Sequence, residues 1–125
     1  MLLVACSPSP APAGTTIDVT EKDFAILTSA PVTSAGDLTL VITNHGPATH
    51  ELVVVRSDLP VDQFQIGPDG LSADEDALTI VDEIGQVDYG TTEALHLSLS
   101  PGRYVLMCNL EGHYLGGMHT ALVVS

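Results

Sequence analysis

Hydrophobic and polar residues alternate along most of the chain after residue 14. The stretch 37–44 shows the pattern best, because Leu38, Leu40 and Ile42 are separated by single residues that are smaller or polar. Such alternation is typical of a β-strand with one buried face, since successive side chains point to opposite faces. Alternating segments or short apolar runs of the same kind occur at 16–20, 24–27, 51–55, 91–99, 103–108 and 120–124.

Turn residues separate these segments. Asn44-His45-Gly46-Pro47 follows one predicted strand, and Pro101-Gly102 follows another. Short strands at this spacing, joined by such turns, are typical of a β-sandwich. We therefore expect an all-β fold, a Greek-key β-sandwich of about seven or eight strands.

The stretch 56–90 breaks the β pattern. Residues 62–66 fit either a strand or a helical turn, whereas Ser72-Ala73-Asp74-Glu75 fits a helix-capping box. The acidic residues that follow the cap favour a first helical turn, where the helix dipole stabilises negative charge. We expect a short helix near Asp74–Ile80, in a loop excursion that leaves the sandwich.

Charge narrows the range of partners. The chain has 125 residues, of which 16 are Asp or Glu and 3 are Lys or Arg, giving a formal net charge of −13. This balance argues against binding to nucleic acid or to anionic lipid through a basic patch. It favours either a basic partner or life in high salt. The acidic residues of the excursion form either a solvated face or a docking surface for that partner: Asp74, Glu75, Asp76, Asp82, Glu83 and Asp88.

The first fourteen residues differ in composition from the rest. Leu3-Val4-Ala5-Cys6 is similar to a bacterial lipobox, in which Cys6 would carry the lipid, and the Ser/Pro/Ala-rich stretch 7–14 suits an extended tether. The piece before Cys6 is shorter and less basic than a working signal peptide. Three interpretations remain open. The true start of the protein lies upstream, or residues 1–6 are the shortened leader of an exported protein, or this apolar segment has no targeting function. We expect a tether at 1–14 and one domain at 15–125.

The C-terminal region carries the candidate chemistry. Cys108, His113 and Met118 are each separated by four residues and lie between two predicted strands. Thiolate, imidazole and thioether are the side chains that bind copper, and blue-copper sites use two His, one Cys and a weak axial Met. The glycines of this loop allow it to curl around one point. His50, at the head of a predicted strand, could supply the fourth ligand.

Simpler interpretations exist for each residue alone. Cys108 could be an ordinary core cysteine and Met118 ordinary core packing. Cys6 and Cys108 could form a disulfide, and a zinc site would require more Cys or His and no Met. His45 and His96 fit solvated surface positions, and His119 should point away from the metal.

Taken together, the motifs Asn44-x-Gly46-x-x-x-His50 and Cys108-x4-His113-x4-Met118 resemble the cupredoxin family. The likeness is to the small plastocyanin- and azurin-like group, with a ligand loop similar to that of auracyanin. The resemblance implies one type 1 copper ion held by His50, Cys108, His113 and Met118. It also implies an apolar rim around the exposed edge of His113, formed by Tyr114, Leu115, Gly116, Pro47 and Ala48.

Two residues depart from the family pattern. Glu111 stands where the family often has proline before Gly-His, and Glu51 stands where an asparagine often follows the first His. The asparagine side chain ties the two ligand loops together. An ionised glutamate cannot donate a hydrogen bond, so we expect Glu51 to make any such tie through its backbone N–H.

The expected function is single-electron transfer outside the cytoplasm by a monomeric copper protein that is not an enzyme. A basic, cytochrome-like redox partner would dock near His113, and the membrane would be reached only through a lipid at Cys6. Two other functions compete with this one. One is copper storage, delivery or buffering without redox work. The other is an enzyme with additional coppers, which the remaining histidines are not arranged to hold.

Overall fold

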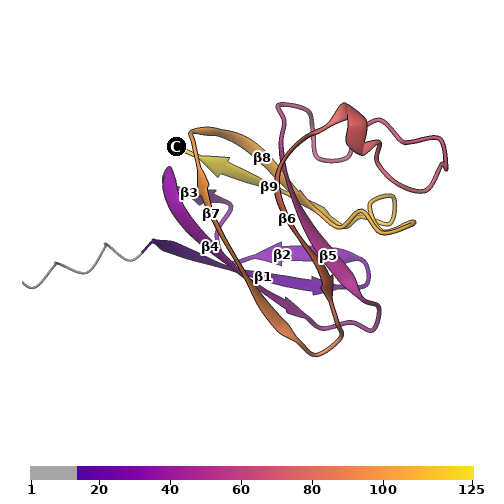
Figure 1. Ribbon diagram of the computed structural model, residues 1–125, viewed down its shortest axis with the longest axis horizontal. Coiled ribbons are helices and arrows are strands. Elements are labelled where there is room, and N and C mark those ends of the chain that lie inside the picture. Colours follow the sequence, from indigo (N-terminus) through magenta and orange to yellow (C-terminus); the bar gives the residue numbers. More distant parts are fainter. Residues whose placement is uncertain (1–13) are drawn as a thin grey trace, which may run out of the picture.

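Two β-sheets pack face to face in the computed structural model, which describes residues 14–125 (Figure 1). One sheet has the order β2 (Ala25–Thr28), β1 (Thr15–Lys22), β4 (Gly36–Asn44) and β7 (Thr92–Leu99). The other has the order β3 (Val32–Thr33), β9 (His119–Val124), β8 (Gly102–Met107), β5 (His50–Arg56) and β6 (Thr79–Val87). This arrangement confirms the predicted β-sandwich. Cys6 and the predicted tether, apart from Gly14, lie outside the described residues.

Each sheet mixes parallel and antiparallel pairs. β1 runs parallel to β4 and β3 parallel to β9, while the other neighbours are antiparallel. Several strands that follow each other in the chain, such as β4 and β5, lie in different sheets, as in Greek-key sandwiches. No helix within residues 14–125 is long and apolar enough to cross a membrane.

The alternating pattern of β4 sets the main core between the sheets. Leu38, Leu40 and Ile42 are at most 2% exposed, as the alternation predicts. They pack against residues of the opposite sheet such as Leu52 and Leu106. Burying a side chain of this size stabilises the fold by roughly 1.5–3 kcal/mol.

A second, smaller core lies on the outer face of the β5–β8 pair. Val53, Val55 and Met107 point away from the main core, and Phe64 and Tyr114 pack against them. Residues 57–78 therefore cover this face of the sheet. The cover explains why β5 reads as a continuous apolar run, since a strand buried on both faces loses its alternation.

The structure corrects the prediction for residues 56–90. Residues 79–87 form a regular edge strand, β6, which pairs with β5, so this part does not leave the sandwich. The expected helix is a single 3₁₀ turn at Glu75–Ala77, capped by the carboxylate of Asp74, which accepts a hydrogen bond from the Asp76 N–H. The helix cannot reach Ile80, because Thr79 is already paired with Arg56. Residues 62–66 form neither helix nor strand beyond an isolated bridge at Ile66.

Candidate metal site

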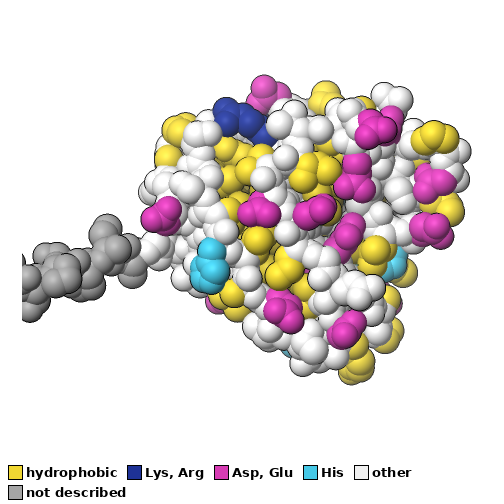
Figure 2. Space-filling view, in the orientation of Figure 1, with side chains coloured by type: hydrophobic (Ala, Val, Ile, Leu, Met, Phe, Trp, Pro, Cys, Tyr) yellow, Lys and Arg dark blue, Asp and Glu magenta, His cyan; other side chains and the backbone are white. Residues whose placement is uncertain are grey.

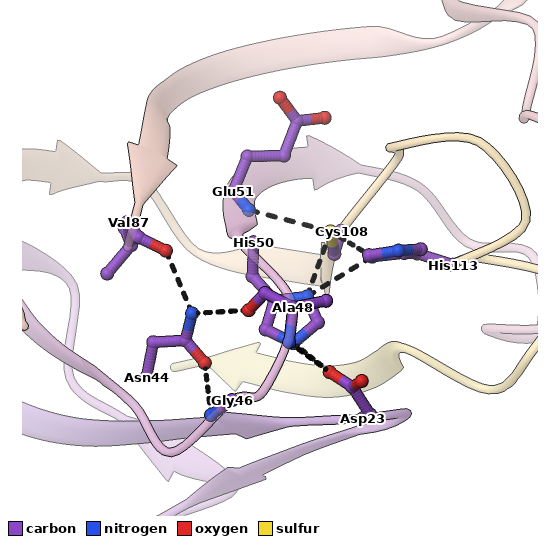
Figure 3. Close-up of polar contacts among 9 residues, drawn as sticks. All are labelled: Asp23, Asn44, Gly46, Ala48, His50, Glu51, Val87, Cys108 and His113. Atoms are coloured by element: carbon purple, nitrogen blue, oxygen red, sulfur yellow. Dashed lines mark hydrogen bonds and ion pairs between the residues drawn. The ribbon is translucent and has the colours of Figure 1, made fainter. Parts of the chain in front are cut away.

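Three side chains from two separate parts of the chain meet at one end of the sandwich (Figure 3). His50 is the first residue of β5, Cys108 directly follows β8, and His113 lies in the loop that joins β8 to β9. β5 and β8 are antiparallel neighbours, with Val53 opposite Met107, so the start of one lies beside the end of the other. The pairing of these two strands therefore brings the two halves of the site together.

The donor atoms converge on one point. The two Nδ1 atoms of His50 and His113 are 3.1 Å apart. The Sγ atom of Cys108 lies 3.4 Å from Nδ1 of His113 and 3.9 Å from Nδ1 of His50. Ligand atoms at roughly 2.0–2.3 Å from a metal, arranged about it in a triangle, are separated by about 3.5 Å. The spacing and the donor set, two imidazoles and a thiol, fit one type 1 copper ion.

Met118 closes the same loop. Its side chain is fully buried in the core cluster that contains Cys108. Its carbonyl oxygen accepts a hydrogen bond from the Cys108 N–H at 3.1 Å, and its N–H donates to the His113 carbonyl at 3.1 Å. The loop that carries Cys108, His113 and Met118 is thus fixed by its own backbone, with Gly112 and Gly117 at positive φ where it bends.

The thiol of Cys108 is fully buried and has no disulfide partner within residues 14–125. Burial raises the pKa of Cys108 to about 11, although the backbone N–H groups of Glu51 and Leu110 favour the thiolate. The Glu51 N–H lies 3.5 Å from Sγ. A metal must therefore displace the proton, because the thiolate is the binding form.

Glu51 ties the two halves of the site in two ways. Its backbone N–H reaches Cys108, as expected from the sequence. Its carboxylate also takes part, by accepting a hydrogen bond from the Asn109 N–H at 3.2 Å. The expectation that only the backbone of Glu51 could form this tie is wrong. The donor on the other loop is the Asn109 N–H, and a carboxylate can accept from it.

Asn44 holds the loop that delivers His50 (Figure 3). Its side-chain amide donates to the carbonyls of Ala48 and Val87, both at 2.8 Å, and its oxygen accepts from the Gly46 N–H at 2.7 Å. Gly46 has φ of +64°, and a Cβ there would come 2.3 Å from the ring of Tyr89. Only glycine fits this bend, which explains the Asn-x-Gly spacing before His50.

Sequence reasoning missed a contribution from the turn between β1 and β2. Asp23 accepts a hydrogen bond from Nε2 of His50 at 2.8 Å. The ring of Phe24 packs edge-on against His113, with centroids 5.3 Å apart. Asp23 lies 27 residues from His50 in the chain, so no local spacing could reveal the pair. Phe24 was predicted to begin a strand, but β2 begins at Ala25 and the Phe24 ring is half exposed.

His50 itself is fully buried. Burial lowers the pKa of His50, and the hydrogen bond to Asp23 opposes that change. A neutral imidazole offers a lone pair to a metal, so burial favours the form that a ligand needs.

The rim around His113 differs in part from the expectation. Leu115, Gly116 and Pro47 are exposed, and Ala48 is partly exposed. Tyr114 is buried instead, because its ring stacks on Phe64 and its hydroxyl donates to the Val61 carbonyl at 2.6 Å. The exposed aromatic ring at the rim is that of Phe24.

The remaining histidines stand apart from the donor cluster. His45 and His96 are exposed, and His96 pairs with the hydroxyl of Thr39 at 2.9 Å. The ring of His119 packs on Tyr114, with centroids 5.1 Å apart. Among residues 14–125, the one group of three or more metal-binding side chains with converging donor atoms is His50, Cys108 and His113.

Two mixed sheets with this donor set define a cupredoxin, the fold class of blue copper proteins, and comparison with solved structures agrees. Auracyanin from the photosynthetic bacterium Roseiflexus castenholzii is 25% identical, with a TM-score of 0.64 over 90% of this chain and 98% of its own. Auracyanin A, a "blue" copper protein from Chloroflexus aurantiacus, has a TM-score of 0.63 at 21% identity, over 90% of this chain and all of its own. An azurin from Methylomonas sp. strain J shares the fold, with a TM-score of 0.60 at 17% identity, over 90% of this chain and 99% of its own.

Residues 20–125 match the model of the sulfocyanin (SoxE) domain, and the chain belongs to this family. No curated protein sequence matches the chain significantly. The family assignment confirms the cupredoxin resemblance drawn from the Asn44–His50 and Cys108–Met118 motifs.

Proposed function

We propose that His50, Cys108, His113 and Met118 hold one copper ion that carries single electrons between redox partners. The observation that carries the proposal is the convergence of two Nδ1 atoms and one Sγ atom within 4.8 Å of one another, in a cupredoxin fold. A copper ion in such a site alternates between Cu(II) and Cu(I).

The chain holds these donors in place by several independent contacts. The Glu51 N–H reaches Sγ, Asp23 binds the far side of the His50 ring, and backbone hydrogen bonds close the loop from Cys108 to Met118. A site fixed in this way changes little when one electron arrives or leaves. Rigid placement of ligands supports fast electron transfer. The residues that bury Cys108 also keep water away from the metal site.

A visible spectrum tests the proposal. Copper-loaded protein should show the intense absorption of a thiolate bound to Cu(II), whereas a colourless Cu(II) complex would contradict it. Cys108→Ser should lose the colour even if some copper still binds. Ser98→Ala, an exposed change on β7, is a matched control that should keep the spectrum of the wild type.

A redox titration separates electron transfer from copper storage. A carrier should show a reversible one-electron couple and should be reduced and reoxidised without losing metal. Binding of Cu(I) alone, with no reversible couple, would instead favour storage, delivery or buffering. A spectrum with only type 1 copper would also dispose of the alternative of an enzyme with additional coppers.

Electrons should enter and leave at the edge of His113. This side chain is partly exposed, and exposed apolar groups lie beside it, including Phe24 and Leu115. An open cleft of about 660 Å³ lies nearby, lined by residues of 67–76 and by Asn109–Glu111. Its acidic side chains Asp69, Asp74, Glu75, Asp76 and Glu111 favour a basic, cytochrome-like partner.

Small redox reagents of opposite charge test this electrostatic preference. The protein should react faster with a cationic complex than with an anionic complex of equal potential. The first rate should fall with added salt and the second should rise, because salt screens attraction and repulsion alike. Equal salt dependence for both reagents would contradict the proposal.

The protein is proposed to act outside the cytoplasm, tethered by a lipid at Cys6. The support is the lipobox-like sequence Leu3-Val4-Ala5-Cys6 and the Ser/Pro/Ala-rich stretch after it. Mass spectrometry of the protein expressed with its native upstream sequence would show a diacylglyceryl group on Cys6. An unmodified Cys6 in membrane-free fractions would contradict the anchor but not the copper site.

A further inference from the structure

The carboxylate of Asp23 lies behind His50, on the side of the ring that faces away from the other donors. Oδ1 of Asp23 is 2.8 Å from Nε2 of His50, and the same oxygen accepts a hydrogen bond from the Ala48 N–H at 3.2 Å (Figure 3). The backbone N–H of Asp23 donates to the Gly46 carbonyl at 3.1 Å. Asp23 is thus bonded to the loop that carries His50 through both its backbone and its side chain.

This contact determines where the proton of the neutral imidazole sits. A carboxylate accepts hydrogen bonds but cannot donate them, so Nε2 must carry the proton. Nδ1 is then left with a free lone pair, and Nδ1 is the atom that lies 3.1 Å from Nδ1 of His113 and 3.9 Å from Sγ of Cys108. The hydrogen bond therefore selects the tautomer that can bind a metal at the donor cluster.

The contact also brings a negative charge close to the cluster. His50 is fully buried, while the Asp23 side chain is 21% exposed, so solvent screens this charge only in part. A carboxylate behind a ligating imidazole makes the ring a stronger donor. A stronger donor and a nearby negative charge both favour the more highly charged metal ion.

We propose that Asp23 is a positioning residue of the copper site, which fixes the His50 tautomer and lowers the reduction potential by favouring Cu(II). This inference rests on the proposed copper function. It concerns a residue in the β1–β2 turn that has no place in either ligand motif.

Three substitutions separate the hydrogen bond from the charge. Asp23→Asn keeps an oxygen that can accept from His50 and Ala48 but removes the charge. Asp23→Ala removes both, and Asp23→Glu restores a carboxylate. All three keep the backbone hydrogen bond to Gly46, so the turn should retain its position. Asp37→Asn is the matched control, because Asp37 is seven residues before Asn44 on β4, about 23 Å from the end of the strand nearest the site.

Nitrogen-15 NMR of the copper-free protein reports the tautomer directly. In the wild type, Asp23→Asn and Asp37→Asn, the proton of His50 should reside on Nε2. In Asp23→Ala, signals should show a mixture in which Nδ1 is protonated in part, and Asp23→Glu should restore the wild-type spectrum. An unchanged tautomer in Asp23→Ala would overturn the positioning role.

Redox titration of the copper-loaded proteins tests the charge. Asp23→Asn should raise the potential by about 59 mV, which corresponds to a tenfold shift in the ratio of Cu(I) to Cu(II) affinity. Asp23→Ala should bind Cu(II) about 10–100-fold more weakly. A potential in Asp23→Asn that equals that of Asp37→Asn would overturn the effect of charge. If the wild type takes up no copper, the proposed function and the charge effect both fail, while the NMR experiment still decides the positioning role.

Discussion

At the scale of single residues, Glu21 is the most unusual side chain of the domain. It follows Ile17 and Val19 on the core-facing side of β1 and is fully buried. Neither of its carboxylate oxygens has a hydrogen-bond partner among the described residues. A buried carboxylate without partners is costly, so the neutral acid is favoured. Burial, assisted by the nearby charge of Glu51, raises the pKa of Glu21 to about 8.

Stability should therefore fall as the pH rises. Between pH 4.5 and about 8 the folded protein keeps the proton of Glu21 and the unfolded chain loses it. Each pH unit in this window costs about 1.4 kcal/mol for a fully shifted group, and the dependence ends above the folded pKa. Urea unfolding of copper-free protein at several pH values measures the slope.

Glu21→Gln provides the comparison. The variant should show a shallower slope, with the difference from the wild type confined to this window. Part of the slope should remain, because burial also raises the pKa of Glu51. Identical slopes in the two proteins would show that Glu21 is ionised in the folded state.

Three of the four proposed ligands could be identified from the sequence because their spacing is local: Cys108, His113 and Met118 share one loop, and His50 was found through its own motif with Asn44 and Gly46. Asp23 and Glu21 could not. Asp23 acts through His50, which begins a strand of the other sheet. Glu21 breaks the rule that core-facing positions of a strand are apolar. Pairs that form only when distant segments meet leave no pattern in a single sequence.

At the scale of elements, the strands with one buried face were predictable and the edge of the second sheet was not. β4 and β7 alternate cleanly, as in Leu95, Leu97 and Leu99. β6 carries Asp82 between Ile80 and Ile84 on its partly buried face, so its periodicity is broken. It is recognised as a strand only because its backbone completes the sheet beside β5.

Tyr114 connects the ligand loop to the cover formed by residues 57–78. Its hydroxyl donates to the Val61 carbonyl and accepts from the Phe64 N–H at 3.1 Å. Tyr114→Phe keeps the stacked ring but leaves both backbone groups without this partner. We expect a loss of about 1–3 kcal/mol in unfolding free energy and faster amide exchange at Phe64. Unchanged exchange at Phe64 would mean that water replaces the hydroxyl.

Asn44 has a similar role on the other side of the site. Asn44→Ala removes its three hydrogen bonds to Gly46, Ala48 and Val87 and should reduce the unfolding free energy by about 2–4 kcal/mol. Thr43→Ala is the matched control, since the Thr43 hydroxyl pairs only with the exposed Thr92 side chain. This substitution should reduce the unfolding free energy by about 0.5 kcal/mol or less. Equal losses in the two variants would contradict this role for Asn44.

At the scale of the whole molecule, the charges are unevenly spread. Figure 2 shows acidic side chains spread over most of the visible face and one small group of basic atoms at its upper edge. Arg56, one of the three basic residues of the chain, donates hydrogen bonds to Ser100 and to the Pro101 carbonyl. The net charge of −13, read from the sequence, thus becomes a surface on which like charges repel one another.

Salt should therefore stabilise the protein. Raising sodium chloride from about 10 mM to about 0.5 M shortens the Debye length and screens the repulsion among the acids, so the melting temperature should rise. Calorimetry over this range of salt concentration measures the effect. A melting temperature independent of salt would show that the acids are too far apart to matter.

The parallel pairing of β1 with β4 also fixes the polarity of the domain. Thr15 lies beside Leu38, and Glu21 lies beside Asn44, next to the loop that leads to His50. The chain therefore enters at one pole and presents the donor cluster at the other, about 20 Å away (Figure 1). Gly14, where the described residues begin, therefore lies at the pole opposite the His113 edge, and a group attached at this position would leave that edge open.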